Sequence, residues 1–168
     1  MFERFNTPEE LFSFKLGSAL TMEQKLVGAL EDFEASAQRD DIKRAFRNHR
    51  NETRQHVANL EQCFTLLGEE VDDSPCPVIE AMTKESTATI KKTDDALVDA
   101  VVLSAATESE HYEIAVYETL VTNGEARGAA EVVALLRQNL DQEKHALDIA
   151  RSALRTIAQQ GNAVGATT

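Results

Sequence analysis

The chain has 168 residues, of which 42% are hydrophobic and 5% aromatic, with seven glycines and three prolines. This length accommodates one domain with a sizeable core, predicted over 1–168 with its ordered part at about 7–160, and the composition favours a largely helical protein. The formal net charge of −12 argues against binding to nucleic acid or to an anionic membrane, because both require basic patches.

The first predicted helix begins at Thr7-Pro8-Glu9-Glu10. The side chain of Thr7 can cap the helix, Pro8 suits the first turn, and Glu10 completes a capping box with Thr7. Apolar residues then recur at helical spacing until a break near residues 38–40. This pattern predicts one long helix from Pro8 to the break near residues 38–40.

Four more helices are predicted downstream. The second starts near residue 42 and ends at Gly68, a residue type common just beyond helix ends. An acidic, turn-rich loop over 69–77 leads to a shorter helix at about 78–92. The third long helix spans about 96–122, where Asn123-Gly124 should stop it, and the fourth spans about 129–160. Residues 161–168 should form a frayed tail.

The connections between these helices predict the topology. The links within the first pair and the last pair of long helices are short, so each pair should form an antiparallel hairpin. The link between the pairs, over 68–95, is long. We therefore predict an all-α, ferritin-like four-helix bundle with a short extra helix in the crossover.

Cysteine content and the N-terminal sequence bear on the compartment. Cys63 and Cys76 are too few for a disulfide framework and lack the spacing of a metal-binding pair. The first ten residues contain no basic and apolar signal segment, and no run of about 18 apolar residues occurs. We expect a soluble, cytoplasmic protein with reduced thiols.

Acidic residues interrupt the apolar stripe of every long helix. An unpaired carboxylate in a dry core is too costly to tolerate, so it must be paired or bind a cation. Two divalent cations would balance four such charges. We predict that the carboxylates meet at one depth in the bundle and hold two metal ions; in chain order they are Glu23, Glu52, Glu110 and Glu143.

Further side chains lie beside these carboxylates. His49 and His56 flank Glu52 one turn away on either side, and Glu113 follows one turn after Glu110. We predict His56 and Glu113 as additional ligands, and His49 and Tyr117 as supporting groups or alternative ligands. The other two histidines, His111 and His145, should face solvent. Imidazole and carboxylate together suit iron, manganese or zinc, and these ligand types alone do not select among the three. Iron is the leading candidate.

Several motifs resemble the YciE/YciF-type ferritin-like stress proteins of bacteria. The motifs, within a resemblance that covers about residues 7–158, are His49-Arg-Asn-Glu52-Thr53, Glu110-His111-Tyr112-Glu113-Ile114-Ala115 and Leu140-Asp-Gln-Glu143-Lys144. The resemblance implies a di-metal carboxylate centre, a homodimer and induction under stress, and it implies no settled activity. The chain departs from the related Glu-x-x-His pattern, because Gln55 and Ala146 occupy the histidine positions.

The leading hypothesis is a redox metalloprotein in which two iron or manganese ions, bridged by Glu52 and Glu143 or by a neighbouring pair of carboxylates, react with peroxide or dioxygen. In that case the protein is a di-metal peroxidase or oxidase. The alternative is a non-catalytic stress protein in which metal cross-links and stabilises the four helices. The sequence indicates no catalytic residue and no organic cofactor.

Overall fold

A computed structural model of the chain describes residues 4–165, with side chains through residue 160, and contains helices and no strands in that range. The predicted all-α bundle is confirmed. The five helices are α1 (Pro8–Ser36), α2 (Asp40–Leu67), α3 (Pro77–Ile90), α4 (Asp95–Ala126) and α5 (Ala130–Gly165). Among the described residues, no helix carries an apolar stretch long enough to cross a membrane.

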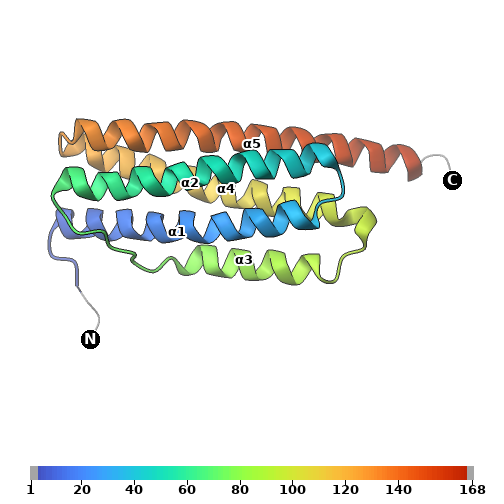
Figure 1. Ribbon diagram of the computed structural model, residues 1–168, viewed down its shortest axis with the longest axis horizontal. Coiled ribbons are helices and arrows are strands. Elements are labelled where there is room, and N and C mark those ends of the chain that lie inside the picture. Colours follow the sequence, from blue (N-terminus) through green and yellow to red (C-terminus); the bar gives the residue numbers. More distant parts are fainter. Residues whose placement is uncertain (1–3, 166–168) are drawn as a thin grey trace.

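The four long helices form two antiparallel hairpins, α1 with α2 and α4 with α5 (Figure 1). The hairpins pack through contacts of α2 with α5 and of α1 with α4, so α1 and α5 lie on a diagonal of the bundle. The chain returns along the length of the bundle between α2 and α4, and α3 lies in this crossover against α1 and α4. This is the topology predicted from the loop lengths.

The start of α1 and the end of α2 follow local sequence signals. Oγ1 of Thr7 accepts a hydrogen bond of 3.1 Å from the backbone N–H of Glu10, as a cap should. The carboxylate of Glu10 accepts from the N–H of Asn6 rather than from Thr7, so the predicted capping box closes one residue early. Gly68 ends α2 with a φ of 72°, in the left-handed region that favours glycine.

Two predicted helix ends are wrong. Helix α4 continues through Asn123-Gly124 because Gly124 is buried against α5, where an added Cβ would lie 2.9 Å from Cγ2 of Val133. Close packing here outweighs the low helix propensity of glycine. The chain reverses instead at Gly128, with a φ of 68°. Helix α5 also extends to Gly165, so 161–165 are helical and not a frayed tail; 166–168 lie outside the described residues.

A buried carboxylate fixes the turn between α1 and α2. Asp99 of α4 accepts hydrogen bonds from the backbone N–H groups of Gln38 (2.7 Å) and Arg39 (3.2 Å). The side chain of Arg39, the N-cap residue of α2, makes no capping hydrogen bond to the backbone of the helix. Asp99 therefore satisfies orphan donors at the start of α2 from a different hairpin, and holds the two hairpins in register.

Candidate metal centre

Four glutamates are buried where the long helices meet. They come from three helices, and none is more than 2% exposed: Glu23 (α1), Glu110 and Glu113 (α4), and Glu143 (α5). Helix α2 faces them with two buried histidines, His49 and His56, which are two helical turns apart. Each long helix thus contributes polar side chains to one level of an otherwise apolar core.

Glu52 is the exception among the predicted carboxylates. Its side chain is 39% exposed, and its contact within this cluster is with His49, outside the dry centre. The neighbouring residue Thr53, fully buried, occupies the inward position between His49 and His56. At about 100° per residue, the inward line on α2 passes through Thr53 and leaves Glu52 to one side. The predicted position of Glu52 at the centre is wrong.

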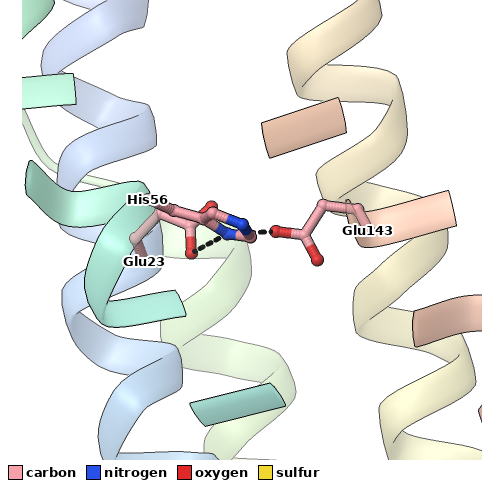
Figure 2. A group of neighbouring side chains, drawn as sticks. All are labelled: Glu23, His56 and Glu143. Carbon is pink, nitrogen blue, oxygen red and sulfur yellow. Dashed lines mark ion pairs between the residues drawn. The ribbon is translucent and has the colours of Figure 1, made fainter. Parts of the chain in front are cut away.

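Glu23, His56 and Glu143 form a first group of potential ligands, the inner group (Figure 2). Nδ1 of His56 lies 2.8 Å from Oε1 of Glu143 and 3.5 Å from Oε2 of Glu23. The other ring nitrogen, Nε2, lies 2.8 Å from Oε1 of Gln142. If Nε2 donates to this amide oxygen, the lone pair of Nδ1 is available to bind a metal ion on the side of the ring where the two carboxylates lie.

His49, Glu110 and Glu143 form a second group, the outer group. Nε2 of His49 lies 3.0 Å from Oε1 of Glu110 and 3.5 Å from Oε2 of Glu143. On the far side of the ring, Nδ1 lies 3.5 Å from Oε2 of Glu52. The two groups share Glu143, whose Oε1 faces His56 and whose Oε2 faces His49.

Behind the inner group lies a chain of hydrogen bonds. Tyr117 donates to Oε1 of Glu23 at 2.5 Å, and the Nδ2 amide of Asn139 donates to the Tyr117 hydroxyl at 3.0 Å. Nδ2 of Asn59 in turn donates to Oδ1 of Asn139 at 2.7 Å. This chain connects α1, α4, α5 and α2, and it fixes the orientation of Glu23.

Asn59, Asn139 and Gln142 also contact the site and are not among the residues predicted from the sequence. The first two could have been found by the reasoning that identified the glutamates. Asn139 lies one turn before Glu143 on the same apolar stripe, and Asn59 lies one turn after His56. Gln142 carries no such signal, since an amide beside a carboxylate is common on helix surfaces. His111 and His145 are exposed, as predicted.

Burial dominates the electrostatics of the cluster. It raises the pKa of Glu23, Glu113 and Glu143, and neighbouring carboxylates raise the pKa further. For His56, burial alone would lower the pKa, but Glu143 and Glu23 outweigh it and raise the pKa to about 10. The pKa of His49 is likewise raised well above its usual value, by Glu110 and Glu52 against the effect of burial. In the absence of another cation, the cluster retains protons.

Several of these buried atoms have no hydrogen-bond partner, which is rare in a folded protein. Nδ1 of His56 is close to Oε1 of Glu143 but is not aligned for a hydrogen bond. Nitrogen and oxygen donors grouped within 4.8 Å of one another suit a transition-metal ion, so the donor set fits a pair of divalent cations. The unpartnered atoms are Oε2 of Glu23, Nδ1 of His49, Nδ1 of His56, Oε2 of Glu110, Oε2 of Glu113 and both carboxylate oxygens of Glu143.

Comparisons with known proteins agree with the fold and with the predicted resemblance. Protein YciF of Escherichia coli K12 is 30% identical over 140 residues, which are 82% of this chain and 84% of YciF. The crystal structure of the E. coli stress protein YciF superposes with a TM-score of 0.88 at 25% identity, covering 92% of this chain and 99% of YciF.

A second solved structure is similar to the same degree. YcfI of Rhodopseudomonas palustris, described as a candidate structural protein, has a TM-score of 0.86 at 30% identity, covering 90% of this chain and 97% of YcfI. The family described as "Domain of unknown function (DUF892)" matches residues 7–163. The similarity to the stress protein YciF extends over most of the chain, and the chain is a member of the DUF892 family.

Proposed function

We propose that the protein is a stress protein that binds two divalent metal ions, iron or manganese, in the centre of its bundle. The observation that carries the proposal is the sharing of Glu143 by two ligand groups, several of whose buried atoms lack hydrogen-bond partners. Glu23 and His56 would hold the inner ion, His49 and Glu110 the outer ion, and Glu143 would bridge them. Glu113 lies in the same cluster and would complete the shell.

Redox activity toward peroxide or dioxygen is the function that this arrangement supports best. When bound, two such ions would supply electrons to a small oxidant and stabilise the charge that develops on it. The chain's own residues have different tasks. Tyr117 holds Glu23 in one orientation through a hydrogen bond, and the carboxylate of Glu52 lies 3.5 Å from Nδ1 of His49, on the side of the ring away from Glu110. Apolar residues around the cluster exclude bulk water.

The test begins with elemental analysis of protein purified without added metal, followed by hydrogen peroxide turnover. We expect two ions per chain, and turnover that is lost in Glu143→Gln. Glu108→Gln is the matched control, because Glu108 is exposed on α4 and lies two residues before Glu110. A protein that fails to bind two ions would contradict the metal centre, and a loaded protein without turnover would contradict the redox activity alone.

A non-catalytic structural role is the second candidate. It is supported by the inner group, whose three residues are fully buried and tie together α1, α2 and α5. In this role metal binds only the folded state and stabilises the bundle. A large fall in melting temperature on chelation, together with no reaction of the loaded protein with peroxide or dioxygen, would select this role.

A homodimer and a cytoplasmic location complete the proposal. The dimer is supported by the resemblance to bacterial stress proteins, and the location by Cys63 and Cys76, both free and buried. Light scattering coupled to size-exclusion chromatography tests the dimer, and fractionation of the producing cells tests the location.

A further inference from the structure

We propose that the two metal positions differ in access: the outer position exchanges its ion with solvent through a cleft between α2 and α5, and the inner position is closed. This inference rests on the proposed function. It adds a route into the centre, the chemical class of what the route admits, and an order of loading.

A cleft of about 630 Å³ lies over the outer group, lined by residues of α2, α4 and α5. Buried His49 and Glu110 form part of its lining, whereas exposed Asp41 and Asp148 stand at its mouth. Oε2 of Glu110, a residue only 2% exposed, has no hydrogen-bond partner. The cleft therefore leads from solvent to His49 and Glu110, two buried ligand residues of the outer group.

In the part of the chain that the structure describes, the inner group is closed to solvent. Glu23, His56 and Glu143 are fully buried, and none of them lines the cleft. Gln142 covers Nε2 of His56, and the Tyr117 hydroxyl covers Oε1 of Glu23. An ion can reach the inner position only past the outer one or by a local opening of the helices.

The charge of the cleft determines what it admits. Its titratable lining residues are Asp41, Glu52, Asp148, Glu110, His49 and His145, with no lysine or arginine among the lining residues. Arg39 pairs with Asp41 at 2.8 Å, so Asp148 and Glu52 provide most of the unbalanced negative charge near solvent. Acidic groups at the mouth of a cleft with apolar walls attract cations and repel anions. The apolar part of the wall includes Phe46, Ala146 and Ala150. The route thus suits divalent cations and small uncharged molecules such as hydrogen peroxide, and it excludes anionic oxidants and anionic chelators.

The probe for this route is Co²⁺, whose visible absorption reports the binding of each ion. Mixing metal-free protein with excess Co²⁺ should give two phases, a fast one for the outer ion and a slow one for the inner ion. Glu110→Gln should remove the fast phase, and Glu23→Gln should remove the slow one. These two variants assign the phases to their groups independently of any catalytic activity.

Filling the cleft tests the route itself. Ala45→Phe places a bulky ring in the lining and should slow the fast phase several-fold, with two ions still bound at equilibrium. Ala58→Phe is the matched control, exposed on the same helix and outside the cleft, and should leave the phase unchanged. If Ala45→Phe does not fold, as judged by circular dichroism, Asn48→Trp at an exposed lining position takes its place.

Neutralising the mouth gives a second measurement. Asp148→Asn should slow the fast phase by about two- to threefold at low salt, and the effect should disappear at high salt. Asp141→Asn, exposed on the same helix but outside the cleft, is its control. If the protein binds two ions but neither Ala45→Phe nor Asp148→Asn alters the fast phase, the proposed route is wrong while the metal centre stands. Protein that binds no Co²⁺ would overturn the metal centre itself.

Discussion

The hydroxyl group of Tyr117 on α4 donates a hydrogen bond of 2.5 Å to Oε1 of Glu23 on α1, and both side chains are fully buried. Asn139 donates to the same hydroxyl oxygen, so Tyr117 stands between a carboxylate and an amide and satisfies both. Removing this one oxygen leaves two buried polar groups short of a partner.

Tyr117→Phe should therefore destabilise the metal-free protein by about 1–3 kcal/mol, the cost of leaving buried polar groups unpaired. It should also lower the affinity for the inner ion, because Glu23 loses the hydroxyl group that orients its carboxylate. Urea denaturation and Co²⁺ titration measure the two effects. Tyr112→Phe is the control, since among the described residues the Tyr112 hydroxyl has a single, weak hydrogen-bond partner, Sγ of Cys76 at 3.4 Å. Equal effects of the two variants would show that Tyr117 has no special role.

Glu113→Gln should stabilise the metal-free protein at neutral pH. Burial, together with Glu143, Glu110 and Glu23, raises the pKa of Glu113 well above its usual value, so folding at pH 7 requires this carboxyl to take up a proton. Glutamine removes that requirement, with an expected gain of roughly 1–3 kcal/mol that vanishes below pH 4.

Added metal should raise the melting temperature of the same variant by less than that of the unsubstituted protein, because the variant lacks one ligand oxygen. Thermal melts with Mn²⁺ and with chelator, compared with those of Glu108→Gln, separate the two effects. A loss of stability in metal-free Glu113→Gln would mean that this carboxyl is held by partners and is not an unsatisfied ligand.

The stability of the metal-free protein should fall as the pH rises. The folded-state pKa of His56 is raised from 6.5 to about 10, so its contribution is complete below pH 6.5 and is lost as the pH rises through about 10. The raised pKa values of Glu23, Glu113 and Glu143 act with the same sign, starting from about pH 4.5. Metal-loaded protein should show the reverse trend, because binding displaces these protons.

Urea denaturation in chelator between pH 6 and 9 measures this slope. His56→Gln should flatten it, whereas His111→Gln, at an exposed position, should leave it unchanged. A metal-free protein whose stability rises across this range would contradict the proton-holding cluster.

Two glycines of α1 should respond in opposite ways to alanine. A Cβ at Gly17 would lie 2.8 Å from the backbone oxygen of Asp72 and 3.0 Å from the backbone nitrogen of Ser74, so the loop after α2 would have to move. A Cβ at Gly28 would meet nothing within 4 Å. Gly17→Ala should cost about 1–3 kcal/mol from overpacking, and Gly28→Ala should gain about 0.5–1 kcal/mol from helix propensity. Chemical denaturation of both variants in chelator provides the comparison.

The features predicted correctly are those with a local cause. The cap of Thr7, the end of α2 at Gly68 and the loop lengths follow from a few neighbouring residues, and together they predict the bundle. The end of α4 was missed because Gly124 is kept helical by Val133 of another helix, a contact that no local pattern reveals.

The centre was predicted in composition but not in detail. Periodicity identified the buried glutamates on α1, α4 and α5, because each replaces a core residue on a clear stripe. On α2 it could not choose between the adjacent Glu52 and Thr53, since a rotation of about 100° exchanges the inward and lateral positions. His49 consequently faces the carboxylates, and Glu52 stands behind it.

The position of the charged cluster, halfway along the four long helices, affects where the bundle opens by local unfolding. Helices normally open from their termini, but here Thr7, Gly68 and Asp99 secure several helix ends, while carboxylates crowd the middle. In metal-free protein, the backbone amides around His56 and Glu143 should exchange with deuterium faster than those a few turns away, and metal should reverse that order. In the metal-free protein, local unfolding should therefore begin in the middle of the bundle and not at the helix ends.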